Sequence, residues 1–301
     1  MKTFIFDKYG YRIEKEGVKE FDFSNWKFKL EANQKSEMEL LELNNFIINV
    51  DDTLYKRGVR IVPTRNDNLS CDSEYGKLSL VAVNKFNVSL DDLVFMHRQY
   101  FSINNPTNYT SINIIKDLWI NKVDNIENKI LPSIKIDNFL YEKIYSLIVY
   151  SLGLGENAIS YLQDIILDYG DKIEEVTLSH KRFLKFDSYE LLNPFNLIVD
   201  SPFRDLADLY KIGIINKENI EQILNMYNVT NKNASLFFAR ILFPSNLFDL
   251  LEEQYVTRID IKKELLVYYN NLEVYLEKIR FIHQYLVNRY GIRPINWLLL
   301  E

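Results

Sequence analysis

The feature that most constrains this chain is a change of hydrophobic period near Val88. Before that point apolar and polar residues alternate, as in strands whose successive side chains point to opposite faces. After it, apolar residues recur every three or four positions, as on one face of a helix. Because 301 residues, 47% of them hydrophobic, can bury a sizeable core, the pattern predicts a folded α+β protein with segregated elements.

Short alternating runs mark the strands of the first part, and turns at Gly10 and Gly17 separate the earliest of them. Capping-box patterns at Ser36 and Ser89 predict the starts of two helices. Residues 65–76 are polar and are expected to form a loop. The predicted strands are Phe4–Phe6, Val18–Phe23, Trp26–Leu30, Val59–Pro63 and Lys77–Asn84.

Helical periodicity dominates the rest of the chain, and Gly291 followed by Pro294 predicts where the last long helix ends. No linker rich in Pro, Gly or Ser interrupts it. We therefore predict two lobes, residues 1–86 and 87–301. The helical stretches are Ile114–Ile120, Tyr141–Leu152, Ala158–Leu167, Asn219–Tyr227, Ser235–Leu242 and a long pair within Ile261–Tyr290.

Charge and cysteine content exclude several classes of protein. A formal net charge of −6 without a run of Lys or Arg argues against nucleic-acid binding. Cys71 is the only cysteine, so no internal disulfide can form, which suits a reducing compartment. Apolar runs are too short to span a bilayer, and the N-terminus lacks a secretory pattern. The expected location is the cytoplasm, or a structure assembled inside the cell.

The segment from Leu178 to Lys211 resembles the active-site region of kinases, whose general layout is a small sheet with one helix followed by a helical lobe. His180, Arg182 and Asp187 occupy the positions of the catalytic-loop His, Asp and Asn. Asp200 ends an apolar run, as the metal-binding Asp of kinases does.

Four further sequence motifs narrow this resemblance to a subfamily. Arg204-Asp-Leu-Ala is similar to the motif that follows the metal-binding Asp in relatives of aminoglycoside phosphotransferase and choline kinase. The strings around Gly153–Tyr161, Phe238–Ser245 and Ile295–Leu298 resemble the spore coat kinase-like proteins of endospore-forming Firmicutes. The resemblance covers nearly the whole chain. It implies a protein-kinase-like two-lobed fold and association with the forespore or spore coat, with other coat or scaffold proteins as partners.

Two departures from the kinase pattern bear on mechanism. Arg182 stands where the catalytic Asp would be, and a guanidinium cannot accept a proton at neutral pH. The chain holds only 9 Gly, and Gly10 and Gly17 do not make a G-x-G-x-x-G loop over phosphates. We therefore expect no catalytic residue and no cofactor, unless ATP and Mg²⁺ bind an unorthodox site.

Each candidate site residue has a structural explanation beside the functional one. Lys29 matches the ATP-pairing lysine, but with Lys27 it also fits a solvated strand face. Asp187 could bind Mg²⁺ or cap a short helix, because Asp187-Ser-Tyr-Glu is itself a capping pattern. Asp200 could bind a metal ion that accompanies a nucleotide, or it could accept hydrogen bonds within the fold. His180 and Asp205 are expected to brace the loop.

Two functions remain open from these residues. The first is a pseudokinase with a structural or scaffold role, not an enzyme. The second is a small-molecule phosphotransferase acting on a sugar or amino alcohol with ATP and Mg²⁺. In the first case Arg182 could pair with Asp200 and replace the charge of the missing metal.

Overall fold

The computed structural model describes residues 1–14, 17, 19–54, 58–74, 76–100, 110–133 and 138–299. By its internal contacts the chain forms two compact units. Unit 1 comprises Met1–Phe101 and Thr177–Val199, and unit 2 comprises Ser102–Val176 and Asp200–Glu301. Helix α3 contacts strand β8, which joins the distant segment 177–199 to unit 1. The lobes predicted as residues 1–86 and 87–301 stay a prediction.

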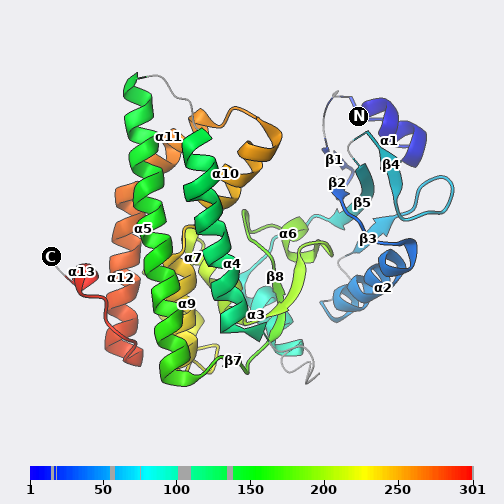
Figure 1. Ribbon diagram of the computed structural model, residues 1–301. Coiled ribbons are helices and arrows are strands. Elements are labelled where there is room, and N and C mark those ends of the chain that lie inside the picture. Colours follow the sequence, from blue (N-terminus) through cyan, green and yellow to red (C-terminus); the bar gives the residue numbers. More distant parts are fainter. Residues whose placement is uncertain are drawn as a thin grey trace. The chain divides into compact units, whose positions relative to one another are not determined.

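In the described part of unit 1, five strands form an antiparallel sheet in the order β1-β2-β5-β3, with β4 paired to β5 (Figure 1). One face of this sheet packs on Ile5 and Tyr9, and its central residues Phe28, Leu30 and Leu80 are buried. The elements are α1 (Lys2–Tyr9), β1 (Glu20–Phe23), β2 (Trp26–Ala32), α2 (Glu37–Thr53), β3 (Val59–Val62), β4 (Cys71–Ser73), β5 (Gly76–Asn84) and α3 (Leu90–Gln99).

Four of the five strands predicted for this region are confirmed, and the first is wrong. The alternating Phe4 and Phe6 belong to helix α1, because Ile5 and Tyr9, four positions apart, are its buried pair. Gly10 ends that helix at φ 83° with its N–H bonded to the Phe6 carbonyl. The loop predicted at residues 65–76 contains strand β4, which is too short to show an alternation of apolar and polar residues.

Both predicted capping boxes are present. The Ser36 hydroxyl accepts a hydrogen bond from the Glu39 N–H, and the Glu39 carboxylate accepts one from the Ser36 N–H at 2.7 Å. Ser89 and Asp92 form the same reciprocal pair at the start of α3. Glu39 therefore serves as the capping partner of Ser36, and its pKa is lowered by the Ser36 backbone hydrogen bond.

The later segment of unit 1 forms a short hairpin with a helical turn inside it. Strand β8 (Thr177–His180) pairs with β9 (Leu197–Asp200), and α6 (Ser188–Leu192) lies between them in the chain. The Lys181 N–H donates to the Asn196 carbonyl at 2.7 Å, which closes the hairpin. This segment corresponds to the kinase-like strand, loop and strand predicted from the sequence.

Unit 2 is a helical assembly in which α5 packs along α4 and α9, and α9 also contacts α7 and α12 (Figure 1). Trp119 of α4 stacks on Phe243 with ring centroids 4.2 Å apart. The elements are β6 (Thr110–Ser111), α4 (Ile112–Asn125), η1 (Ile126–Ile130), η2 (Leu131–Ser133), α5 (Asn138–Tyr169), β7 (Lys172–Ile173), α7 (Pro202–Lys211), α8 (Ile220–Leu224), α9 (Asn231–Leu242), α10 (Ser245–Thr257), α11 (Lys262–Asn270), α12 (Leu272–Tyr290) and α13 (Asn296–Leu299).

Helix α5 was predicted as two helices, and that prediction is wrong. Gly153 and Gly155 separate the two apolar runs in sequence, yet the helix continues through both. An internal glycine costs a helix only ~1 kcal/mol. At Gly155 a Cβ would lie 3.1 Å from Val123 and 3.2 Å from Phe248, so the missing side chain lets neighbouring elements approach.

The end of α12 follows the predicted chemistry. Gly291 adopts φ 63° just past its last turn and returns an N–H to the Val287 carbonyl. Among the described helices, none alone has the length and apolar character to cross a membrane; α9 and α10 meet that test only when counted together, and they meet at a 42° bend.

Candidate functional site

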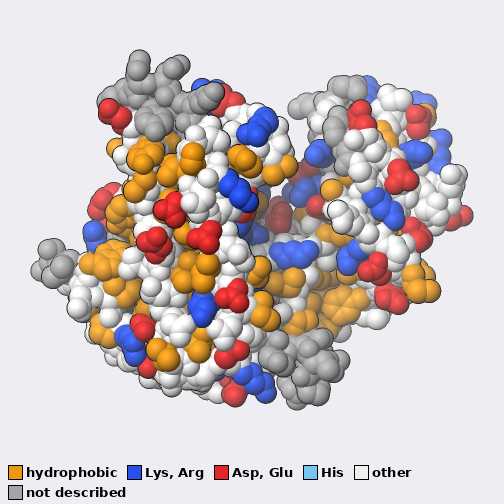
Figure 2. All heavy atoms as spheres, in the orientation of Figure 1, with side chains coloured by type: hydrophobic (Ala, Val, Ile, Leu, Met, Phe, Trp, Pro, Cys, Tyr) orange, Lys and Arg blue, Asp and Glu red, His pale blue; other side chains and the backbone are white. Residues whose placement is uncertain are grey.

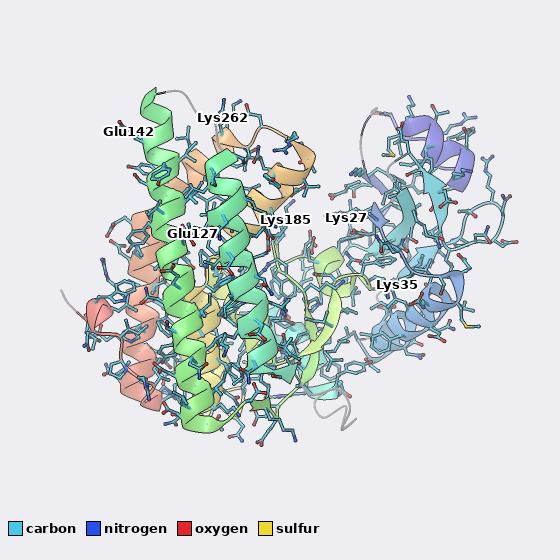
Figure 3. The ribbon with its side chains drawn as sticks, in the orientation of Figure 1. Lys27, Lys35, Glu127, Glu142, Lys185 and Lys262 are labelled. Atoms are coloured by element: carbon cyan, nitrogen blue, oxygen red, sulfur yellow. The ribbon has the colours of Figure 1, made fainter. Side chains whose placement is uncertain are left out.

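Strand β2 presents two lysines on the same face of the sheet. Successive strand residues point to opposite faces, so Phe28 and Leu30 enter the core while Lys27 and Lys29 lie on the other side. Figure 3 labels Lys27 on this strand. The predicted sharing of one face by the two lysines is confirmed.

Lys27, rather than Lys29, pairs with Asp187 of the kinase-like loop in unit 1. Its ammonium is 3.2 Å from Asp187 Oδ2 and 3.1 Å from Glu20 Oε1. The other oxygen of Asp187 accepts the Glu190 N–H at 2.9 Å and so caps helix α6. Asp187 thus has the capping role that its sequence pattern suggested, together with an ion pair to β2.

Lys29 is paired within its own strand. Its ammonium lies 3.1 Å from Glu31 Oε1, and the same oxygen accepts hydrogen bonds from Tyr189 Oη at 2.9 Å and Asn193 Nδ2 at 3.0 Å. Lys27 and Lys29 both lie over the buried Tyr189 ring, 5.4 and 5.3 Å from its centroid. The aromatic ring therefore contacts both cations, and Glu31 holds Lys29.

The charges of this lysine–carboxylate cluster, made of Lys27, Lys29, Glu20, Glu31 and Asp187, compensate one another. Burial opposes the charge of Lys27, but hydrogen bonds from its ammonium to Glu20 and Asp187 raise its pKa. Burial also raises the pKa of the neighbouring Glu190, and the Asp187 charge adds to that effect. Three carboxylates face two ammonium groups, so the cluster offers no excess positive charge to a triphosphate.

A second cluster, in unit 2, surrounds Asp200. Arg240 Nη2 donates to both carboxylate oxygens at 2.9 Å, and Arg204 Nη1 donates to Oδ2 at 2.8 Å. The Ser201 N–H donates to Oδ1 at 2.7 Å. Asp200 is 2% exposed and Arg240 is 8% exposed, so the pair is screened from water. We call Asp200, Arg204 and Arg240 the arginine–aspartate cluster.

These residues do not fit a divalent cation at Asp200. A metal there would meet two guanidinium groups and would have to compete with them for the carboxylate oxygens. Burial lowers the pKa of Arg240, while the Asp200 charge raises it, so each member of the pair depends on the other. Among the described residues no group of three or more His, Cys, Asp or Glu is arranged to hold a metal ion.

Of the remaining predicted residues, His180 and Asp205 lie in the interior, and Arg182 is partly exposed. His180 is buried, its Nε2 donates to the Leu191 carbonyl at 2.9 Å, and its ring lies 4.2 Å from that of Phe183. The backbone of Arg182 exchanges two hydrogen bonds with the Asn196 side chain. Asp205 is fully buried in α7. The structure describes Arg182 in unit 1 and Asp200 in unit 2, and their pairing stays a prediction, as do nucleotide binding at Lys29 and metal binding at Asp187 or Asp200.

Sequence reasoning missed the residue that contributes most to the arginine–aspartate cluster. In the stretch Ala234–Leu242 every residue except Ser235 and Arg240 is apolar. A charged side chain on such a buried helix requires a partner. That signal was available, although nothing in the sequence names Asp200 as the partner. Glu31 and Tyr189 were also missed, because only the folded loop brings them to Lys29.

Strand, loop and helix together define the class of the protein: a protein-kinase-like fold with a small antiparallel sheet, a hairpin carrying the loop residues, and a helical body. The chain belongs to the family described as "Spore coat putative kinase YutH", whose pattern matches residues 2–288. It is 28% identical over 166 residues to the endospore coat-associated protein YutH of Bacillus subtilis (strain 168). That match covers 47% of this chain and 46% of the relative, so it spans less than half of the relative's length.

Two solved structures are similar to this chain at low sequence identity, and one of them shares its fold. A crystal structure of spectinomycin phosphotransferase APH(9)-Ia, in complex with ADP and spectinomycin, is similar with a TM-score of 0.58 at 13% identity, over 94% of this chain and 97% of that chain. An aminoglycoside phosphotransferase from Alicyclobacillus acidocaldarius has a TM-score of 0.47 at 9% identity, over 88% of this chain and 90% of its own. The first similarity confirms the predicted kinase-like fold class.

Proposed function

We propose that this protein is a kinase-like scaffold that does not transfer phosphate and that acts in the spore coat. The observation that carries the proposal is the bidentate contact of Arg240 with Asp200, supplemented by Arg204. An active kinase keeps the equivalent carboxylate for a metal ion that bridges the phosphates. Here two guanidinium groups already satisfy it, and they stabilise the fold instead.

The lysine–carboxylate cluster and the loop support the same proposal. Lys29 would have to leave Glu31, and Lys27 would have to leave Asp187, before either could bind a phosphate. Arg182 stands at the position of the general base, and a guanidinium does not accept a proton at neutral pH. Loss of a general base alone typically lowers the rate by ~10²-fold or more.

A partner surface is needed for a scaffold, and unit 2 offers one. Ile114 and Leu118 of α4 and Tyr145 and Val149 of α5 are exposed. Figure 2 shows hydrophobic side chains among charged ones over these two helices. Ile114 and Leu118 lie about one turn apart on α4, and exposed apolar groups on one helix face are candidates for protein contacts. The description of the family supports the proposal of coat association, and the chain is expected in the coat fraction of spores of the organism that encodes it.

One observation favours the alternative, a phosphotransferase acting on a sugar or amino alcohol. The Asp187 side chain is 36% exposed, and an exposed ion pair with a lysine is weak enough to be exchanged for a metal and a phosphate. In that case ATP and Mg²⁺ would bind through Lys27, Lys29 and Asp187, without Asp200.

The test is transfer of labelled phosphate from ATP, with Mg²⁺ or Mn²⁺, to a panel of amino alcohols, sugars and aminoglycosides. We expect no product above the background without protein. Turnover that requires both the protein and ATP would contradict the proposal. Turnover that disappears in Asp187→Ala but survives in Asp200→Ala would favour the alternative function.

A further inference from the structure

Strand β1 lies at an edge of the unit 1 sheet, and its register with β2 shows which of its backbone groups are unpaired (Figure 1). The Leu30 N–H donates to the Lys19 carbonyl at 2.9 Å, so these two residues form a hydrogen-bonded pair. Such pairs alternate with unbonded ones in an antiparallel ladder. The backbone of Phe21 therefore bonds to β2, whereas the N–H and C=O groups of Glu20 and Asp22 point away from it. Within the described part of the chain, these four groups have no hydrogen-bond partner.

A hollow of about 410 Å³, which we call the edge groove, lies between β1 and residues 12–14. Its volume is within the range of ligand-binding clefts. The aromatic side of β1 is only partly covered: Phe21 stacks on the core residue Phe28 at 5.0 Å, whereas Phe23 is 60% exposed and touches Tyr11 at 6.1 Å. Sheet edges are usually protected by Pro, Lys or a bulge, and β1 has none of these. The edge is therefore open to a further strand.

The charges that line the edge groove are mainly negative. Among its described lining residues, Glu14, Glu20 and Asp22 carry carboxylates, and one residue, Arg12, carries a guanidinium. Arg12 lies over the Phe6 ring of α1, 5.4 Å from its centroid. Glu20 and Asp22 each pair with a lysine of the sheet, and their side chains remain 47% and 59% exposed. The edge groove therefore complements a basic partner better than an acidic one.

From these observations we propose that β1 binds, as an added antiparallel strand, an extended segment of another protein in which basic and apolar side chains alternate. Residues opposite each other in antiparallel strands share a face, so basic side chains meet Glu20 and Asp22, and the apolar ones between them meet Phe21 and Phe23. A second copy of β1 would place Glu20 opposite Asp22, and like charges in that position are destabilising. The inference does not rest on the proposed function, because this edge is the same whether or not the protein transfers phosphate.

The probe is a fluorescent hexapeptide of alternating Lys and Val, blocked at both ends, and its binding to the full chain is measured by anisotropy. In the proposed pairing the amides of the Lys residues face β1, and the amides of the Val residues face solvent. Two matched peptides carry N-methyl groups, one on the Lys amides and the other on the Val amides. We expect the parent and the Val-methylated peptide to bind with dissociation constants of about 0.1–1 mM. The Lys-methylated peptide should bind about tenfold more weakly, and so should a peptide with Glu in place of Lys.

Two variants at one position assign the binding to β1. Asp22→Pro removes an outward N–H without removing a bond to β2, whereas Asp22→Ala keeps that N–H and removes only the carboxylate. Asp22→Pro should bind the parent peptide about tenfold more weakly than Asp22→Ala does. Asp72→Ala, at an exposed position of β4 that does not line the edge groove, is the control and should bind as the wild type does.

Circular dichroism and the melting temperature check that each variant is folded, and the methylated peptides test the pairing on the wild type alone. Three results would overturn the proposal. The first is no binding of the parent peptide at about 5 mM. The second is equal binding of the two methylated peptides, which would mean that charge alone holds the peptide. The third is sedimentation of the free protein as a dimer that Asp22→Pro dissociates, which would mean that a second copy occupies this edge.

Discussion

Arg240 holds Asp200 by two hydrogen bonds of 2.9 Å, one to each carboxylate oxygen. Arg240 comes from helix α9 and Asp200 from the end of β9, so the contact joins elements 40 residues apart in the chain. Both side chains are buried, and the Asp200 carboxylate also accepts a hydrogen bond from Arg204 Nη1 at 2.8 Å. The carboxylate that the sequence predicts to match the metal-binding Asp of kinases is therefore part of the core of unit 2.

Removing one member of this pair should leave the buried charge of the other without a partner. We expect Arg240→Met and Asp200→Asn each to lower the free energy of unfolding by ~3–5 kcal/mol, because a buried charge loses its partner. The double variant should cost much less than the sum. Urea unfolding followed by circular dichroism gives the three values and the coupling energy.

The control for this cycle is Arg280→Met, which removes an exposed guanidinium 3.4 Å from Glu273. A surface pair of that kind should contribute under ~1 kcal/mol. Additive effects of Arg240→Met and Asp200→Asn would mean that the two residues do not depend on each other.

A conservative substitution at Asp187 tests whether this residue serves the fold as a helix cap. Asparagine caps helices about as well as aspartate, whereas alanine does not. Asp187→Ala should therefore cost ~0.5–2 kcal/mol of stability, and Asp187→Asn should recover most of that loss. Thermal unfolding of the two variants measures the difference. Equal losses in both would indicate that the charge on Asp187, rather than its cap, is what the fold requires.

The sequence predicted the elements whose stabilising groups lie close together in the chain. Capping boxes at Ser36 and Ser89 and the Gly291 cap are local, and all three are present. Helix α1 was mistaken for a strand because an eight-residue segment can satisfy both periods. The pairing of Asp200 with Arg240 depends on tertiary contacts 40 residues apart, which no local pattern encodes.

His283 should make stability depend on pH below neutrality. Its Nε2 accepts the Ile295 N–H at 2.9 Å, so the ring is neutral in the fold, and burial lowers its pKa from 6.5 to about 4. Between these values the unfolded chain binds more protons than the folded one. The free energy of unfolding should therefore fall as pH falls from 6.5 to 4, by up to ~3 kcal/mol from this group.

Two measurements isolate that contribution. NMR titration of the His283 ring should show no protonation above pH 5. The variant His283→Gln, which cannot gain a proton, should lose stability less steeply than wild type between pH 6.5 and pH 4. A ring that titrates near 6.5, or identical pH dependence in both proteins, would show that His283 is not held neutral by the fold.

The most direct test of the central claim, that the carboxylates of the kinase-like site are held by the protein's own cations, is a thermal-shift measurement with ATP and Mg²⁺ together and separately. A specific ligand at 100 times its dissociation constant stabilises the folded state by about 2.7 kcal/mol. We predict no rise in melting temperature that requires both ATP and Mg²⁺. A saturable rise that requires both would contradict the claim.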